Sequence, residues 1–257
     1  MLEMKQKGDK IACLTSYDFT LAKLVDQAGI DLILVGDSAA NIMAGYTTTL
    51  PITLDEMITY ARGVVRGVTR AMVVVDMPFG SYQQGPSEAV ASAVRIMKET
   101  GAEAVKLEGG AEIADSIRAI INAGIPVVGH LGLTPQSVNV FGGYGVRAKD
   151  EAEARKFADD CLLLQELGCC AIVFEKIPAR LATEISGRLT VPTIGIGAGN
   201  GTDGQILVLQ DMLGMNEGFK PKFLRHYGDF GSAITDAVHH YVTDVKTADF
   251  PNESEQY

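Results

Sequence analysis

The sequence has few cysteines: Cys13, Cys161, Cys169 and Cys170 are the only four in 257 residues. They form no Cys-x-x-Cys pair, and their spacing does not match that of zinc ligands. Cys169 and Cys170 open an apolar run, a setting in which a free thiol usually packs as a small hydrophobic group. The sequence therefore predicts neither a disulfide framework nor a cysteine-bound metal, and it favours a reducing cytoplasm.

Long apolar runs and an excess of positive charge are also missing. No apolar stretch reaches the ~18 residues that a membrane-spanning helix needs, and the N-terminal MLEMKQKGDK lacks the apolar core of a signal peptide. The formal net charge of −10 disfavours nonspecific attraction to nucleic acid or to an anionic membrane. With 47% hydrophobic and 21% charged residues, the composition is typical of a soluble globular protein, and we expect a cytoplasmic one.

What the sequence does contain is a repeated alternation of short apolar runs and amphipathic stretches. Most of the runs are β-branched and end at Gly, Pro or a charged residue, as buried parallel strands do. They span residues 11–18, 32–38, 71–78, 104–110, 126–132, 170–176, 192–199 and 204–212. Helical periodicity, ending each time at a Gly, is found in segments 19–29, 87–101, 112–124 and 148–168. The run 204–212 is equally compatible with a helix.

Repeated strand–helix units predict an α/β protein in which residues 1–257 form a single (β/α)8 TIM barrel domain. An open doubly wound sheet is the alternative, but CLTSYDF after the first strand is not the glycine-rich turn of a dinucleotide-binding fold. Two long segments, 39–53 and 133–147, follow strands and are expected to build the mouth of the barrel. We expect a C-terminal helix at about 230–248 and a disordered tail at 249–257.

Ionisable residues stand at the ends of five successive predicted strands. Lys106 and Glu108 are two residues apart in one strand, so their side chains point to the same side. Each residue has an ordinary structural explanation as a turn former, a core histidine or one half of an ion pair. Because barrel enzymes place their chemistry at the carboxyl ends of their strands, the joint pattern favours a catalytic site. The residues concerned are Asp37, Asp76, Lys106, Glu108, His130 and Glu175.

The balance of charge at this face predicts a bound cation. Four converging carboxylates would outnumber the cationic groups of Lys106 and His130. Carboxylates crowded in a low-dielectric site either take up protons or recruit a cation. Oxygen ligands favour Mg²⁺ or a similar hard ion over zinc, and such an ion can stabilise the enolate of a 2-oxo acid as a Lewis acid.

The glycine-rich stretch 193–205 leaves more than one interpretation open. Barrels often bind phosphate after their seventh and eighth strands, but the spacing here is neither a Walker A motif nor a Gly-x-Gly-x-x-Gly motif. Close packing at a barrel corner and contact with a large ligand explain it equally well.

Long stretches of the chain resemble the ketopantoate hydroxymethyltransferase family, in the right order and over nearly the whole length. They are VGDS (35–38), TLPITLDEM (49–57), DMPFGSYQ (76–83), VKLEGG (105–110), GHLGLTPQS (129–137), FGGY (141–144), VPTIGIGAGNGTDGQ (191–205), VLQDMLG (208–214) and FKPKF (219–223). The resemblance implies a TIM barrel of the phosphoenolpyruvate/pyruvate type, one Mg²⁺ per subunit and a homodecamer. It also implies transfer of a hydroxymethyl group from 5,10-methylenetetrahydrofolate to 3-methyl-2-oxobutanoate, forming 2-dehydropantoate in pantothenate biosynthesis.

The matching motifs also imply residue roles. Asp37, Asp76 and Glu108 are the expected metal-site residues, and Glu175 in VFEKIP resembles the proton acceptor. The residues expected to contact the 2-oxo acid are Asp37, Ser38, Asp76, Lys106 and His130. The chain departs from the family's pattern at Ala39-Ala40, commonly Leu-Gly, and at Gly145, frequently a basic residue. Both departures lie in the predicted mouth loops, where they bear on the folate contacts rather than on the metal ligands.

Two other functions compete with this interpretation. The first is a 2-oxo-acid carbon–carbon lyase on the same barrel, of the isocitrate-lyase kind, but its KKCGH-type loop is absent here. The second is a barrel that binds a metabolite without catalysis. A complete set of charged strand ends argues against the second alternative, because a degenerate site would have lost some of them.

Overall fold

The computed structural model describes residues 1–216 and 218–257. They divide into two compact units, Met1–Val208 and Leu209–Tyr257. The first unit contains the barrel, and the second contains the C-terminal helix. The expected single domain over residues 1–257 stays a prediction.

The described residues of the first unit form a closed barrel of parallel strands in the order β1 to β8. Each strand pairs with the next along the chain, and β8 pairs with β1 to complete the circle. The strands are β1 Ile11–Thr15, β2 Leu32–Val35, β3 Met72–Asp76, β4 Ala104–Glu108, β5 Val127–Gly132, β6 Ala171–Glu175, β7 Thr193–Ile196 and β8 Gly204–Leu207. The predicted (β/α)8 barrel is confirmed, and the open doubly wound sheet is excluded.

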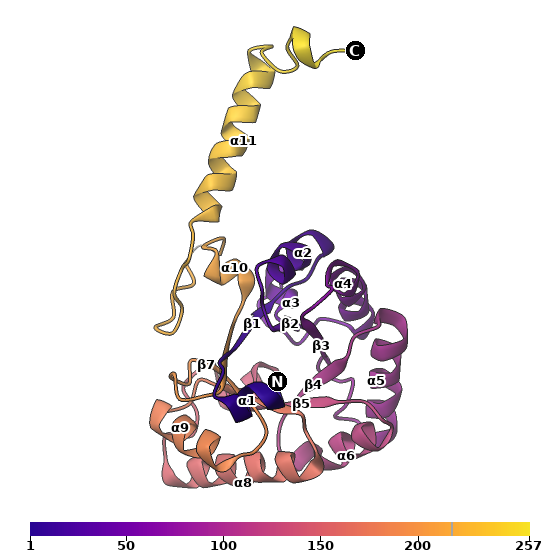
Figure 1. The fold of residues 1–257 in the computed structure, drawn as a ribbon, viewed down its shortest axis with the longest axis vertical. Helices are drawn as coiled ribbons and strands as arrows, with labels where there is room; N and C mark the ends of the chain where they lie inside the picture. The colour runs from indigo at the N-terminus through magenta and orange to yellow at the C-terminus, as the bar shows by residue number, and fades with distance from the viewer. Residues whose placement is uncertain (217) are drawn as a thin grey trace. The chain divides into compact units, whose positions relative to one another are not determined.

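Helices surround the strands (Figure 1). They are α1 Leu2–Lys7, α2 Phe19–Gln27, α3 Ala39–Ile42, α4 Leu54–Gly67, α5 Pro86–Thr100, α6 Ala114–Asn122, α7 Val138–Phe141, α8 Glu151–Leu167 and α9 Ala179–Arg188, with short 3-10 turns η1 Ala111–Ile113 and η2 Pro135–Ser137. The helix α4 begins with a capping box, in which Thr53 and Glu56 each bind the other's backbone N–H. As predicted, α5 and α8 end at glycines, Gly101 and Gly168, in the left-handed conformation that glycine adopts without strain. The helices α4 and α9 are not among the segments for which the sequence pattern predicts a helix.

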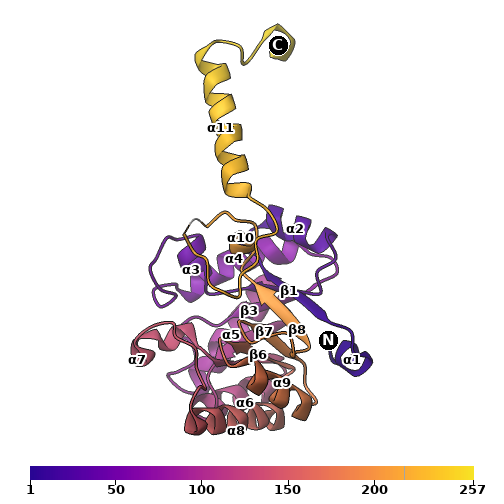
Figure 2. The same cartoon turned by 90° about the vertical axis from the view of Figure 1, so that its left-hand side faces the viewer.

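The two ends of the barrel differ in what covers them. Figure 2 shows α3 and α7 at one end and α1 at the other. The short helices α3 and α7 lie within the long segments 39–53 and 133–147, which follow β2 and β5, so this end carries the carboxyl termini of the strands. The interior of the barrel between the two ends is an apolar cluster to which all eight described strands contribute.

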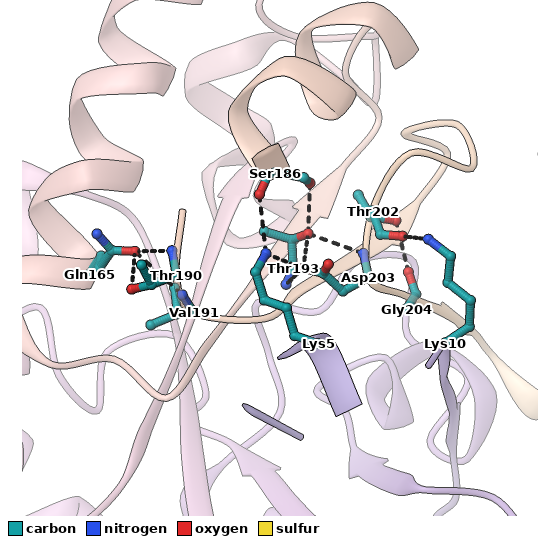
Figure 3. Close-up of polar contacts among 10 residues, drawn as sticks. All are labelled: Lys5, Lys10, Gln165, Ser186, Thr190, Val191, Thr193, Thr202, Asp203 and Gly204. Carbon is teal, nitrogen blue, oxygen red and sulfur yellow. Dashed lines mark hydrogen bonds and ion pairs between the residues drawn. The ribbon is translucent and has the colours of Figure 1, made fainter. Parts of the chain in front are cut away.

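The helix α1 closes the opposite end of the barrel. Its Met4, with Met1 before it, packs against the apolar cluster. Lys5 reaches across from α1, and its Nζ lies 2.7 Å from Asp203 Oδ2 and 3.1 Å from the carbonyl oxygen of Ser186 (Figure 3). The same Asp203 oxygen accepts from the backbone N–H and the hydroxyl of Thr193, at 2.8 and 2.9 Å. One carboxylate thus ties α1 to the first residue of β7.

The glycine-rich stretch 193–205 packs tightly against neighbouring chain segments. A Cβ on Gly204 would lie 2.4 Å from the carbonyl oxygen of Ile11, and one on Gly199 would lie 2.4 Å from the Cβ of Ala179. A side chain at either position would force its neighbours apart. Of the alternatives left open for this stretch, the structure supports close packing at the barrel wall.

The run 204–212 differs from its predicted strand. The strand β8 ends at Leu207, and the second unit opens with the helix α10, Leu209–Met212. Both interpretations of the sequence were partly right, because the apolar run contains a strand and a helix in succession. The tail 249–257, for which we expected disorder, carries a 3-10 turn, η3 Glu253–Glu255, capped by Asn252.

The second unit contains the helix predicted at about 230–248, here α11 Phe230–Lys246. None of its residues is buried, although several are apolar. The exposed apolar residues of α11 are Phe230, Ile234, Val238, Tyr241, Val242 and Val245. Among the described residues of the whole chain, we find no helix with the length and apolar character that a membrane crossing requires.

All four cysteines are free thiols. Cys13, Cys161 and Cys169 are buried, while Cys170 is half-buried. Burial raises the pKa of Cys13 and of Cys169 to about 12, so these side chains stay protonated and inert at neutral pH. The prediction of free, packed cysteines is confirmed.

Candidate active site

The residues predicted to form a site lie at the carboxyl ends of five consecutive strands. Asp37 and Ser38 follow β2, Asp76 ends β3, Lys106 and Glu108 lie in β4, His130 lies in β5, and Glu175 ends β6. The strand register places Asp76 beside Lys106 and Glu108 beside His130. Barrel closure therefore brings together residues that are up to 138 positions apart in the sequence numbering.

Lys106 is the cationic centre of the cluster. Its Nζ lies 3.0 Å from Asp76 Oδ1 and 3.0 Å from His130 Nδ1, and only 4% of the residue is exposed. Its aliphatic stem lines the apolar interior of the barrel, so the ammonium group is held at the boundary between the core and the mouth. Burial acts to lower the pKa of Lys106, but the surrounding carboxylates, Asp76 foremost, raise it above its ordinary value.

His130 connects two carboxylates. Its Nδ1 lies 3.3 Å from Glu108 Oε1, and its Nε2 lies 3.3 Å from Glu175 Oε2. Burial and the adjacent Lys106 act to lower the pKa of His130, but Glu108 and Glu175 outweigh them and raise it to about 9. A protonated imidazole can donate toward both carboxylates, so its close approach to Lys106 is a contact between cations that the carboxylates offset.

Asp37 and Ser38 lie in the turn after β2. The backbone N–H of Asp37 donates to Asp76 Oδ2 at 3.0 Å, which joins the end of β3 to this turn. The Oγ of Ser38 lies 2.8 Å from the hydroxyl of Tyr17, a buried side chain that follows β1. The residue before them is Gly36. A larger residue there would place a Cβ 2.7 Å from Ser38 Oγ and would displace the hydroxyl.

Burial acts to raise the pKa of each of the three acidic side chains nearest Lys106, but the net shifts differ. Burial raises the pKa of Asp37 to about 8, and the charges of Glu108 and Asp76 add to the effect. Burial also raises the pKa of Asp76, although Lys106 offsets part of it. Burial acts in the same direction on Glu108, but His130 and Lys106 hold its pKa below the ordinary value. Asp37 is therefore the carboxylate whose negative charge is least compensated.

The residues present suit a divalent cation by the chemistry of their donors. With Asp37, Asp76, Glu108 and Glu175 ionised against Lys106 and His130, the cluster has an excess of two negative charges, which one divalent ion would balance. The buried Oδ1 of Asp76 has no hydrogen-bond partner among the described residues, although the Lys106 ammonium is near it. Carboxylate oxygens are the ligands that Mg²⁺ prefers.

The carboxylates are not arranged as a complete ligand set. Among residues 1–216 and 218–257, no group of three or more His, Cys, Asp or Glu side chains is arranged to hold a metal ion. The cluster is instead closed by its own ion pairs, with Lys106 against Asp76 and His130 against Glu108. The assignment of Asp37, Asp76 and Glu108 to a metal therefore stays a prediction, as do the other residue roles.

Sequence reasoning missed Gln136, which lies in η2 directly after β5. Its side-chain Nε2 donates to Asp37 Oδ2 at 3.0 Å, and its backbone N–H donates to Glu108 Oε2 at 2.9 Å. Tyr82, in the loop after β3, donates its hydroxyl to Gln136 Oε1 at 2.7 Å. Both residues belong to segments that carry the family resemblance, GHLGLTPQS and DMPFGSYQ, but their side chains are uncharged, so the pattern of charged strand ends does not mark them.

Tyr144 lies in the long segment after β5 and is close enough to the cluster to sense its charge. Partial burial raises the pKa of Tyr144, and the negative charges of Asp37 and Glu175 raise it further. The side chain of Lys176, next to Glu175, donates to the carbonyl oxygen of Tyr144 and ties this segment to the end of β6. The segment 133–147 therefore borders the cluster, as the sequence predicted.

The closed parallel barrel is shared with solved structures of low sequence identity. A phosphonopyruvate hydrolase in complex with oxalate and Mg²⁺ aligns with a TM-score of 0.62 at 13% identity, covering 99% of this chain and 91% of that one. An oxaloacetate acetylhydrolase aligns with a TM-score of 0.62 at 12% identity, covering 97% of this chain and 96% of that one. The class that the fold defines is thus the (β/α)8 TIM barrel.

Within that class, the sequence specifies one family. Residues 1–253 match the family described as ketopantoate hydroxymethyltransferase. A protein of Bacteroides fragilis named 3-methyl-2-oxobutanoate hydroxymethyltransferase is 64% identical over 257 residues, which are 100% of this chain and 94% of that protein. A protein of the same name from Porphyromonas gingivalis is 60% identical over the same shares of the two chains. This chain belongs to the ketopantoate hydroxymethyltransferase family.

Proposed function

We propose that this protein transfers a hydroxymethyl group from 5,10-methylenetetrahydrofolate to 3-methyl-2-oxobutanoate, giving tetrahydrofolate and 2-dehydropantoate. The donor carries a methylene group without oxygen, so one water molecule completes the balance. The observation that carries the proposal is the identity of 60–64% over all 257 residues with relatives named for this activity. We place the reaction in pantothenate biosynthesis and in the cytoplasm.

The 2-oxo acid would bind beside Lys106. Its carboxylate and 2-oxo oxygens carry negative charge and accept hydrogen bonds, and the buried ammonium group of Lys106 supplies a fixed cation at that place. Asp37, Ser38 and Asp76 border the same point from β2 and β3, and His130 borders it from β5. The apolar lining beneath Lys106 keeps the local dielectric low, which strengthens this attraction.

We propose that Asp37, Asp76 and Glu108 hold one Mg²⁺ in each subunit. When bound, the ion would supply Lewis-acid stabilisation of the negative charge that develops on the oxygens of the oxo acid. The excess of negative charge in the cluster and the raised pKa of Asp37 support a cation at this place. Because the pKa of Asp37 is raised to about 8, binding of the cation would favour its ionised form.

Glu175 is the residue we assign to proton transfer. In the reaction, C3 of the oxo acid loses its proton and bonds to the methylene carbon of the folate. Water supplies the hydroxyl oxygen, both C–N bonds of the methylene group break, and the C3 proton and one proton of the water pass to the two folate nitrogens. Glu175 is more exposed than the other carboxylates of the cluster, with 17% of its side chain accessible, so it faces the open side of the site. His130 Nε2, 3.3 Å away, orients the carboxylate and can exchange a proton with it.

Exposed aromatic residues at the mouth are candidates for the folate contacts. Tyr46, Phe79 and Tyr144 follow β2, β3 and β5 and are 41%, 49% and 45% exposed. A pterin ring stacks favourably on aromatic faces of this kind. The departures at Ala39-Ala40 and Gly145 lie in two of the same loops.

The proposed reaction is tested by supplying the oxo acid, methylenetetrahydrofolate and Mg²⁺ together and then omitting each in turn. We expect 2-dehydropantoate only from the complete mixture, measured by mass spectrometry. Product formed without the folate would favour a lyase of the same barrel type. If the protein does not even exchange the C3 proton of the oxo acid for deuterium in the presence of Mg²⁺, a non-catalytic barrel becomes the better interpretation.

The role of Glu175 is tested by Glu175→Gln, which keeps the shape and removes the base. We expect kcat to fall by about 10²- to 10⁴-fold, the usual contribution of a positioned acid or base, while Mn²⁺ affinity changes less than about 2-fold because Glu175 is not an expected ligand. Glu184→Gln, at an exposed carboxylate on α9, is the matched control and should retain full activity. Wild-type turnover in Glu175→Gln would refute the assignment.

A further inference from the structure

The carboxamide of Gln136 uses all of its hydrogen-bonding positions. Its Nε2 donates one hydrogen to Asp37 Oδ2 and the other to the carbonyl oxygen of Met77, both at 3.0 Å. Its Oε1 accepts from the Tyr82 hydroxyl at 2.7 Å and from Gln83 Nε2 at 3.1 Å. A carboxamide has two donor hydrogens and two acceptor lone pairs, so no position is left over.

These partners determine which way the amide points. Turning it around would place Oε1 against the Asp37 carboxylate and the Met77 carbonyl oxygen, with no hydrogen between them, and would place the NH₂ group against the Gln83 amide nitrogen. Gln136 is 6% exposed, so water could not repair the lost bonds at low cost. The donor hydrogens are therefore aimed at Asp37 by the surrounding protein.

Gln136 also holds the second carboxylate through its backbone. Its N–H donates to Glu108 Oε2 at 2.9 Å, which leaves Glu108 Oε1 for His130 at 3.3 Å. One residue after β5 thus binds a carboxylate from the turn after β2 and another from β4. These are two of the three carboxylates that the proposed function assigns to the metal.

Tyr82 binds both Gln136 and the backbone of Glu108 and so helps to hold them in place. Its hydroxyl accepts from the backbone N–H of Glu108 at 3.1 Å. It has one hydrogen to give, and Gln136 Oε1 at 2.7 Å is nearer than the Glu108 carbonyl oxygen at 3.2 Å. The backbone carbonyl of Tyr82 accepts in turn from the Ser116 hydroxyl at 3.0 Å, and the Tyr82 side chain is fully buried. Hydrogen bonds therefore run from Glu108 through Tyr82 and Gln136 to Asp37.

We propose that Gln136 is a positioning residue for the metal site: it holds Asp37 Oδ2 and Glu108 Oε2, which leaves Asp37 Oδ1 for the cation and fixes the Glu108 carboxylate with its Oε1 beside His130. The inference rests on the metal assignment made under the proposed function. Donors that orient the ligands of a metal site contribute to its affinity without touching the metal, because they hold the carboxylates in place before the ion arrives.

The test is Gln136→Met, which retains about the same volume and removes the carboxamide while the backbone N–H remains. We expect the Kd of the metal-free enzyme for Mn²⁺, measured by isothermal titration calorimetry and by electron paramagnetic resonance, to rise about 10- to 100-fold. The matched control is Gln84→Met, because Gln84 is an exposed glutamine of the mouth whose Nε2 donates to the carbonyl oxygen of Gly80. It should bind Mn²⁺ within about 2-fold of the wild type.

Kinetics separates positioning from a general loss of structure. If Gln136 positions the ligands, the Mn²⁺ concentration giving half-maximal activity rises in proportion to the Kd, and kcat at saturating Mn²⁺ returns close to the wild-type value. A structural role alone would lower kcat equally at every metal concentration, with the Mn²⁺ Kd unchanged, and that result would overturn the proposal.

Tyr82→Phe gives a second test should Gln136→Met fold poorly. It removes the hydroxyl, which bonds Gln136 Oε1 and the backbone N–H of Glu108 but no carboxylate oxygen, and we expect the Mn²⁺ Kd to rise by at least about 5-fold, the effect of one hydrogen bond. In the double variant the part of the Tyr82→Phe effect that passes through Gln136 should disappear, because that partner is already gone. Additive effects would contradict the chain of hydrogen bonds. Failure of the wild type to bind Mn²⁺ would instead refute the metal assignment itself.

Discussion

At the scale of single residues, the site is a small set of charges whose protonation depends on burial. Lys106 and Glu108 are separated by one residue in β4, so the pleat turns both toward the same interior. Around them, the cationic groups of Lys106 and His130 have a raised pKa, and that of Asp37 is also raised. Because its pKa, raised to about 8, lies nearer neutral pH than that of His130, Asp37 is the residue at which we expect a change of pH to have the clearest effect.

Asp37→Asn should stabilise the metal-free protein more at pH 8 than at pH 6. The pKa of Asp37 is about 8 in the folded protein against an ordinary value of 3.8. Between these values the folded state keeps a proton that the unfolded chain has released, so wild-type stability falls as pH rises through this window. Facing charges from Asp76, Glu108 and Lys106 remain in both proteins. We expect the difference in unfolding free energy to grow by on the order of 2 kcal/mol between pH 6 and pH 8.

Urea denaturation of both proteins in metal-free buffer measures this difference. Parallel dependence of the two unfolding free energies on pH would contradict it and would mean that Asp37 is ionised in the folded protein at neutral pH.

At the scale of elements, the barrel depends on contacts at both ends of its strands. The carboxyl ends carry the charged cluster, whereas the amino ends are held together by α1 and the ion pair between Lys5 and Asp203 (Figure 3). Asp203 precedes β8 and binds Thr193 at the start of β7, so a single carboxylate joins a helix and two strands. Barrel ends of this kind generally serve stability rather than chemistry.

Lys5→Met should lower the unfolding free energy by about 1–2 kcal/mol, because it leaves a partly buried carboxylate without its cation. The side chains of Lys5 and Asp203 are 13% and 20% exposed. The matched control on the same helix is Lys7→Met, whose exposed partner Glu3 is 3.3 Å away and whose loss should cost less than about 0.5 kcal/mol. Equal effects of the two substitutions on the unfolding free energy would contradict a stabilising role of the Lys5–Asp203 ion pair. We expect kcat to be unchanged in both variants.

At the scale of the whole molecule, a barrel unit is followed by a second unit that buries little by itself. The apolar residues of α11 recur at intervals of three and four, which places them along one side of the helix. An exposed apolar stripe of this length is typical of a surface that another chain covers. The homodecamer that the family resemblance implies stays a prediction, and in such an assembly the covering chain would be a further copy of this protein.

Substituting lysine at both Ile234 and Val238 should therefore reduce the mass of the assembly. We expect the wild type to elute at about ten times the chain mass of 27.4 kDa, and the double variant to form smaller species, because two buried charges would oppose association. The control places lysine at His239 and Thr243, on the opposite side of α11, and should leave the mass unchanged. Light scattering after size exclusion distinguishes the outcomes, and an unchanged double variant would exclude α11 from the interface.

Much of the fold and of the site was predictable from the sequence because the signals are local. A helix repeats every 3.6 residues and a strand every two, so the alternation of elements and the shared direction of Lys106 and Glu108 can be deduced from neighbouring residues. The preference of barrels for chemistry at the carboxyl ends of strands then predicted which residues would meet. Local signals could not decide where β8 stops, because the run 204–212 suits a strand and a helix equally.

The tertiary structure alone decided which uncharged residues support the charged ones. Gln136 and Asp37 are 99 positions apart, and Tyr82 and Gln136 are 54 apart, so no periodicity in the chain relates them. Their hydrogen bonds exist because closure of the barrel brings the turns after β2, β3 and β5 to one mouth. The sequence by itself determined the charges that the site contains, and the three-dimensional fold decided how their orientations are held.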